Sequence, residues 1–107
     1  MAFYELRQYK VRPGKQAEFL KVMEEEIIPL QVAKGMVITG SWRGETDESV
    51  YVWMHRIVSE AQRVQLYKDV YESDARTAGI AQKIPDLLDR TGMVVQQVVP
   101  TVRSVAQ

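Results

Sequence analysis

The sequence contains no cysteine and no asparagine. The absence of cysteine excludes disulfide bonds, thiolate metal ligands and cysteine nucleophiles. The absence of asparagine excludes N-linked glycosylation sites, which require that residue. The absence of cysteine fits a reducing compartment, and we expect a cytoplasmic protein.

An excess of charge of either sign is also missing. Lys and Arg together number 14, and Asp and Glu together number 14, so the formal net charge is zero. A nucleic-acid-binding domain normally carries a basic excess or a basic stripe, and we expect no nucleic acid among the partners. No apolar run approaches the roughly 18 residues of a membrane helix. The first ten residues carry charges from Glu5 onward and do not form a signal peptide, so no membrane association is expected.

The chain is long enough for one hydrophobic core. It has 107 residues, of which 46% are hydrophobic and 26% are charged, as in ordinary globular domains. A chain of this length normally forms one domain, and we take residues 1–107 as a single domain.

Hydrophobic periodicity predicts seven elements. Alternating apolar residues predict strands over 3–11, 36–44, 50–57 and 93–99, and spacings of three and four predict helices over 15–34, 60–72 and 75–89. Pro29 is expected to kink the first helix, and Gly40 to mark a bulge or a close backbone approach. Ser59 and Gln62 have the spacing of a capping box that opens the second helix.

This order, β-α-β-β-α-(α)-β, predicts an α+β fold of the ferredoxin-like type, with a four-stranded antiparallel sheet and its helices on one face. The third strand, VYVWMHRI, is largely apolar on both sides. We expect the uncovered face to carry Phe3, Tyr9, Tyr51, Trp53 and valines of the last strand. Because monomers rarely expose apolar patches of more than a few hundred Å², a second copy should cover that face, which predicts a homodimer.

Several short motifs resemble the NIPSNAP family. The opening YELRQY at 4–9 and KVRPGK at 10–15 look like the start of its domains, and YVWM at 51–54 looks like its aromatic third strand. VYESD at 70–74 and IPDLLDR at 84–90 resemble its C-terminal half. The resemblance spans about residues 3–104 and is specific through the order and spacing of these motifs.

The resemblance implies a ferredoxin-like subunit that pairs into a dimeric α+β barrel. Proteins with such barrels include cofactor-free monooxygenases, haem-degrading enzymes and lactone isomerases, but a shared fold does not fix an activity. One departure stands out, because similar sequences often carry Glu-Trp where this chain has Ala75 and Arg76. If this position borders a pocket, Arg76 favours an acidic ligand.

Two residues are candidates for catalysis. His55, the only histidine, has an ordinary pKa suited to a general base. Arg7 offers a planar guanidinium for a carboxylate or an enolate. The structural alternatives are a buried or solvated histidine and an interior ion pair between Glu5 and Arg7.

Aromatic residues and one further arginine are candidates for ligand binding; the set is Tyr9, Trp42, Trp53, Tyr71 and Arg76. Their structural alternative is an ordinary core and a dimer interface. The histidine has no second histidine or well-spaced carboxylate near it, so no metal site and no cofactor are predicted.

The sequence therefore predicts a small-molecule-binding homodimer. Its catalytic form would be a cofactor-independent enzyme, monooxygenase-like or isomerase-like, that acts on an aromatic or acidic molecule. The alternative is a non-catalytic dimer with a structural or protein-interaction role. An internal cavity with converging polar groups favours the first, and a filled interior favours the second.

Overall fold

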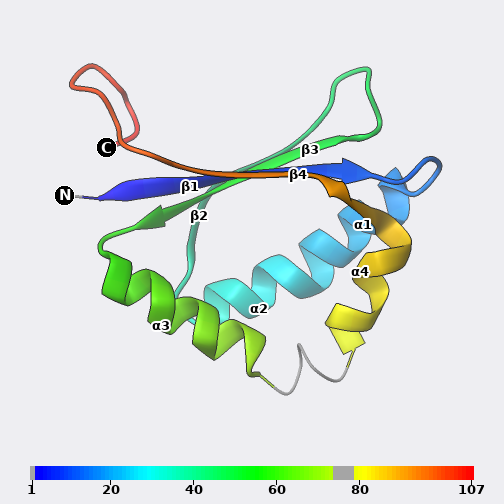
Figure 1. Cartoon of the computed structure of the whole chain (residues 1–107), viewed down its shortest axis with the longest axis horizontal. Helices are drawn as coiled ribbons and strands as arrows, with labels where there is room; N and C mark the ends of the chain where they lie inside the picture. Colours follow the sequence, from blue (N-terminus) through cyan, green and yellow to red (C-terminus); the bar gives the residue numbers. More distant parts are fainter. Residues whose placement is uncertain (1, 74–78) are drawn as a thin grey trace.

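The computed structural model describes residues 2–73 and 79–107. A four-stranded antiparallel sheet in the order β2-β3-β1-β4 carries a layer of helices on one face (Figure 1). The elements, in chain order, are β1 Phe3–Val11, α1 Gln16–Val22, η1 Met23–Ile27, α2 Ile28–Ala33, β2 Val37–Arg43, β3 Val50–Ile57, α3 Glu60–Tyr71, α4 Ala81–Leu87 and β4 Leu88–Val98. The predicted ferredoxin-like fold is confirmed.

The alternation of β3 matches its burial. Tyr51, Trp53, His55 and Ile57 are buried, whereas the four residues that alternate with them, beginning with Val50, are half-buried. β3 pairs with β1 on one side and with β2 on the other, so its ladder hydrogen bonds are satisfied along both edges. A strand in this central position can carry apolar side chains on both faces.

The predicted helix over 15–34 is one helical rod with an irregular middle. α1 is followed by a π-helical turn, η1, and Pro29 stands at the second position of α2. Proline lacks the N–H that a continuing helix requires, so the break lies where the sequence predicted a kink. Phe19 and Met23 both point from this rod into the core.

Three local signals act as the sequence predicted. Ser59 Oγ accepts a hydrogen bond from Gln62 N at 3.1 Å, which caps α3. The ladder between β2 and β3 shifts register between Ile38 and Gly40. The indole ring of Trp42 lies directly over Gly40, where any Cβ would collide with it. Gly40 therefore marks both a bulge and a close approach.

The C-terminal half departs from the prediction. The helix predicted for 75–89 ends at Leu87, and the strand predicted for 93–99 begins at Leu88; positions 74–78 lie outside the described residues. Leu87, the last residue of α4, and Leu88, the first residue of β4, are both buried in the same core cluster. Thr91 and Gly92, predicted to end a helix, lie in β4 instead.

A large bulge of four residues interrupts the pairing of β4 with β1. Gln8 pairs with Val94 and Lys10 pairs with Asp89, so residues 90–93 lie opposite Tyr9 alone. The side chain of Lys10 packs against Gly92, where a Cβ would come within 2.6 Å of Lys10 Cβ. The bulge locally re-aims the side chains of this edge strand.

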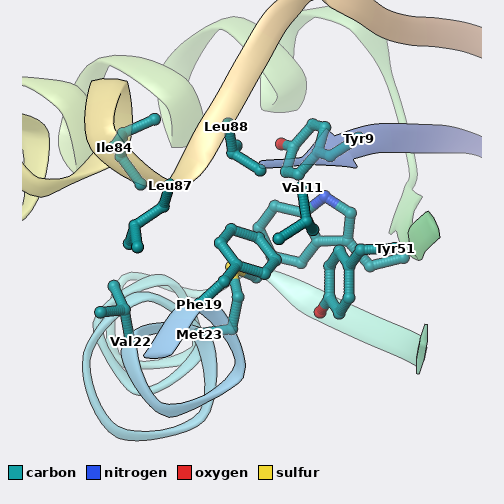
Figure 2. Close-up of a cluster of buried hydrophobic side chains, with 10 residues drawn as sticks. Tyr9, Val11, Phe19, Val22, Met23, Tyr51, Ile84, Leu87 and Leu88 are labelled. Carbon is teal, nitrogen blue, oxygen red and sulfur yellow. The ribbon is translucent and has the colours of Figure 1, made fainter. Parts of the chain in front are cut away.

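The helices cover the opposite face of the sheet from the one predicted. The sequence predicts Tyr9, Tyr51 and Trp53 on the uncovered face, but all three belong to the core cluster. Figure 2 shows Tyr9 and Tyr51 in this cluster with Phe19 and Met23. The strand residues alternate between the two faces of the sheet as predicted. Because both faces are apolar, the sequence pattern alone does not decide which face the helices cover.

The uncovered face carries the alternate residues. Leu6 and Met54 are paired across it, as are Val52 and Trp42. The tail after β4 folds back on this side of the sheet (Figure 1), where the Gln107 carbonyl accepts hydrogen bonds from Tyr4 Oη and Arg56 Nε. No helix among the described residues is long and apolar enough to cross a membrane.

Gly35 follows α2 and has a backbone conformation that favours glycine. Its φ is +98°, a conformation that side chains disfavour, so Gly35→Ala should lower the free energy of unfolding by about 1 kcal/mol. Gly79→Ala is the matched control, because Gly79 has no positive φ and no heavy atom of the described residues lies within 4 Å of an added Cβ. Urea denaturation of both variants measures the difference. Equal effects would contradict the left-handed cap.

Candidate functional site

A cavity of about 280 Å³ lies between the sheet and the helices. Apolar side chains from the rod of α1, η1 and α2 and from α4 form much of its wall, among them Phe19, Met23 and Ile84. Polar side chains reach it from β1, α2, β3, α3 and β4. These are Arg7, Tyr9, Gln31, Trp53, His55, Tyr67, Tyr71 and Arg90.

The cavity brings together most of the residues singled out from the sequence. Arg7, Tyr9, Trp53, His55 and Tyr71 all line it. Their sharing of one wall follows from alternation, since odd-numbered residues of β1 and β3 face the helices and Tyr71 ends α3 above them.

Two of the sequence candidates are not among these residues. Trp42 lies on the uncovered face of the sheet, where 52% of its surface is exposed. It is separated from the cavity by the sheet itself, because its neighbour Ser41 and not Trp42 shares the face of Trp53. Arg76 lies outside the described residues.

A buried carboxylate organises the polar end of the cavity. Glu5 is fully buried, and its Oε1 accepts hydrogen bonds from Arg7 Nε at 2.8 Å and from Tyr67 Oη at 2.6 Å. Its Oε2 accepts from Arg63 Nε at 2.8 Å. Buried charges require such pairing, and the interior Glu5–Arg7 ion pair considered from the sequence is present.

These contacts fix the protonation of the His55 ring. Tyr67 Oη gives its one proton to Glu5, so it can only accept from its other neighbours, Arg7 Nη2 at 3.2 Å and His55 Nδ1 at 3.3 Å. His55 Nδ1 must therefore carry the proton, and Nε2 is left with a lone pair. The ring of Trp53 stands edge-on to the imidazole at a centroid distance of 4.4 Å and holds its orientation.

Buried polar atoms without a hydrogen-bond partner gather at this cavity. Within residues 2–73 and 79–107 they are His55 Nε2, Gln31 Oε1 and Trp53 Nε1, and all three residues line it. The Trp53 indole lies near enough to Tyr9 Oη to influence its pKa but does not form a hydrogen bond of normal geometry. His55 and Gln31 thus each present an unused acceptor.

Burial and charge set the titration of the cluster. Burial, reinforced by the positive charge of Arg7, lowers the pKa of His55 to about 4, although Glu5 acts in the opposite direction. Burial would raise the pKa of Glu5, but hydrogen bonds from Tyr67, Arg63 and Arg7 lower it overall. Burial and the bond to Glu5 raise the pKa of Tyr67. At neutral pH the site therefore holds a neutral imidazole, a carboxylate and a phenol.

Sequence reasoning missed four contributors to this site, namely Gln31, Arg63, Tyr67 and Arg90. Tyr67 lies one turn before Tyr71 on α3, and this spacing is the signal that could have identified it. Arg90 lies within the IPDLLDR motif, but the bulge that brings it beside the cavity has no sequence signature. Gln31 reads as an ordinary polar position on a helix.

His55 Nε2 can accept a proton or a hydrogen bond from a bound molecule. The guanidinium of Arg7 lies close enough to stabilise a negative charge on that molecule. The described residues contain no group of three or more His, Cys, Asp or Glu side chains able to hold a metal ion. The side chains that meet at the cavity are suited to binding an organic molecule.

The buried histidine gives a testable pH dependence. The unfolded chain protonates its histidine near pH 6.5 and the folded chain only near pH 4, so between these values protons favour the unfolded state. The free energy of unfolding should fall by about 2 kcal/mol between pH 7 and pH 5. His55→Gln should remove this fall, as measured by urea denaturation at both pH values. Glu5 contributes to the slope only below its ordinary pKa of 4.5. Parallel slopes in the two proteins would contradict a buried neutral His55.

A family model and three similar solved structures all point to the NIPSNAP family. The NIPSNAP family model matches residues 4–76. A NIPSNAP family protein from Agrobacterium tumefaciens superposes with a TM-score of 0.90 at 22% identity, with complete coverage of both chains. An uncharacterised NIPSNAP-like protein from Burkholderia xenovorans gives 0.85 at 20% identity, covering 96% of this chain and 88% of its own.

A second A. tumefaciens NIPSNAP family protein, of unknown function, has a TM-score of 0.88 at 22% identity and covers 99% of this chain and 94% of its own. No curated protein matches the sequence. The family match extends over more than half of the chain, from the YELRQY opening to two residues beyond the VYESD segment. The chain belongs to the NIPSNAP family.

Proposed function

We propose that this protein binds a small organic molecule in the cavity between its sheet and its helices. One observation carries the proposal: the three buried polar atoms that lack a normal hydrogen bond among the described residues all belong to the cavity wall. An unpaired buried polar group costs about 1–3 kcal/mol. A protein that retains several such groups around one cavity is organised for a ligand that pairs with them.

The shape of the wall supports the same reading. Ligand cavities are mostly apolar with a few converging polar groups, and this one has Phe19, Met23 and Ile84 facing Arg7 and His55. The non-catalytic alternative expects a filled interior, and a cavity of about 280 Å³ argues against that expectation. An aromatic or acidic molecule suits the aromatic wall and the guanidinium.

The catalytic form of the proposal is a cofactor-independent proton transfer, of the isomerase-like kind. His55 Nε2 takes a proton from an acidic C–H or O–H of the ligand, and the resulting anion lies beside Arg7. The imidazolium then returns the proton to a different ligand atom, so the reaction is balanced without a cofactor. A bound anion raises the pKa of His55 toward the working range, because an adjacent negative charge favours the imidazolium.

We propose further that the protein is a homodimer whose two copies meet through the uncovered face of the sheet. Trp42, Val37, Val94 and Val98 on this face have 52%, 50%, 43% and 36% of their surfaces exposed. An apolar face of this kind is the usual site of association with a second copy. The residues differ from those expected from the sequence, but the argument from uncovered apolar surface is unchanged.

A thermal-shift screen of small aromatic and acidic molecules tests binding. A ligand present at about tenfold its Kd should raise the Tm by about 5 °C. Ile84→Phe fills the cavity from α4 and should abolish the shift, whereas Val64→Phe, on the exposed side of α3, should preserve it. A library without a single hit, or hits that bind the Ile84 variant equally well, would refute the proposal.

Sedimentation velocity at micromolar concentration tests association. The wild-type protein should sediment as a dimer, and Val52→Lys should convert it to a monomer by burying an unpaired charge in the interface. Val64→Lys is the control, because Val64 has 58% of its surface exposed on the helical side. A monomeric wild-type protein would exclude the dimer.

A further inference from the structure

The hydrogen-bonding capacity of the cavity restricts the ligand that it can hold. At the end formed by β3 and α2, His55 Nε2 and Gln31 Oε1 are both acceptors, and neither has a donor among the described residues. The two lie at the same end, because Met36 N donates to the Gln31 carbonyl and Ile38, two residues later, is paired with His55. A ligand group beside His55 Nε2 must donate a hydrogen bond, because a carboxylate or a keto oxygen would face a lone pair there.

The opposite end is positively charged. Arg90 lies beside Tyr9, because the neighbouring pairs Lys10–Asp89 and Val11–Leu88 precede it in the ladder. Tyr9 is four residues from Glu5, which is opposite His55, so the two ends are about 13 Å apart along β1. The described wall residues include Arg7 and Arg90 but no aspartate or glutamate. Arg90 makes no ion pair with the described residues, and it is exposed.

Arg7 extends this positive field into the cavity. Its partner Glu5 is shared with Arg63, so one buried carboxylate faces two guanidinium groups. The effect of Arg7 on the His55 ring outweighs that of Glu5, as the order of their contributions to its lowered pKa indicates. Arg7 Nη1 also donates to Tyr9 Oη at 3.4 Å, so the guanidinium reaches from Glu5 toward Tyr9 along the cavity wall.

The volume limits the ligand to about one ring and a short substituent. An apolar cavity of about 150 Å³ holds benzene, and the present cavity of about 280 Å³ is less than twice that size. Phe19, Met23 and Trp53 contribute apolar wall between the two ends.

We propose that the cavity selects a hydroxyaryl carboxylate, with an un-ionised hydroxyl beside Gln31 that donates its one proton to His55 Nε2, and with a carboxylate lying toward Arg7 and Arg90. This inference rests on the proposed function and names the ligand class for the same site. The neutral imidazole is essential to it, because an imidazolium would be a donor and would reverse the preference.

Isothermal titration calorimetry with three matched probes tests the inference. They are 3-(4-hydroxyphenyl)propanoate, 3-phenylpropanoate, which lacks the hydroxyl, and 3-(4-hydroxyphenyl)propanamide, which lacks the charge. The first should bind about tenfold more tightly than either analogue, since each loses one hydrogen-bonded or charged contact.

Variants should separate the two ends. His55→Phe should reduce the preference for the hydroxyl to about one while leaving the preference for the carboxylate. Arg90→Gln should lower the preference for the carboxylate, with Arg7 still present, while leaving the preference for the hydroxyl. Gln31→Leu gives a second variant at the hydroxyl end if His55→Phe does not fold. Gln82→Leu, exposed on α4 and outside the cavity wall, should preserve both preferences.

Equal affinities of the hydroxylated and unhydroxylated acids for the wild-type protein would overturn the inference. The inference would also be overturned if none of the three probes bound while other library members still bound the wild-type protein and not the Ile84→Phe variant. That result would leave the proposed binding function standing. Failure of every compound in the wider screen would instead remove both.

Discussion

A single fully buried carboxylate organises the polar end of the cavity and the docking of α3 on the sheet. Glu5 lies on the central part of the sheet, but two of its partners, Arg63 and Tyr67, come from α3, about sixty residues later. An uncompensated charge in that position would cost several kcal/mol, so α3 must dock where its side chains reach the carboxylate. The same contacts determine which nitrogen of His55 carries the proton. The placement of a helix and the chemistry of the cavity thus depend on one side chain.

The fold was largely accessible from the sequence because its local signals agree with one another. Ser59 caps α3, Pro29 marks the break between helical segments, and Gly40 marks a bulge, each for a reason that involves only near neighbours. The orientation of the sheet was not accessible. Tyr51 and Trp53 look equally suited to a dimer interface and to a core, and only the docking of the helices decides between these roles.

The site was accessible only where it follows from strand alternation. Arg7, Tyr9, Trp53 and His55 share a face of two adjacent strands, so identifying one of them makes the others plausible. Tyr67 joins them through contacts across about sixty residues. Arg90 joins them through a bulge in which four residues oppose one. Neither relationship has a periodic signature, and for this reason composition and spacing did not reveal them.

The distribution of tryptophan has a practical consequence. The chain has two indole rings, one on each side of the sheet, and they are 52% and 2% exposed at Trp42 and Trp53 respectively. A solvent quencher in water reaches the first far more readily than the second, so the two fluorophores report on different events. Emission from Trp42 follows whatever covers the outer surface, and emission from Trp53 follows whatever enters the interior. The protein can therefore be observed on both sides at once without any added label.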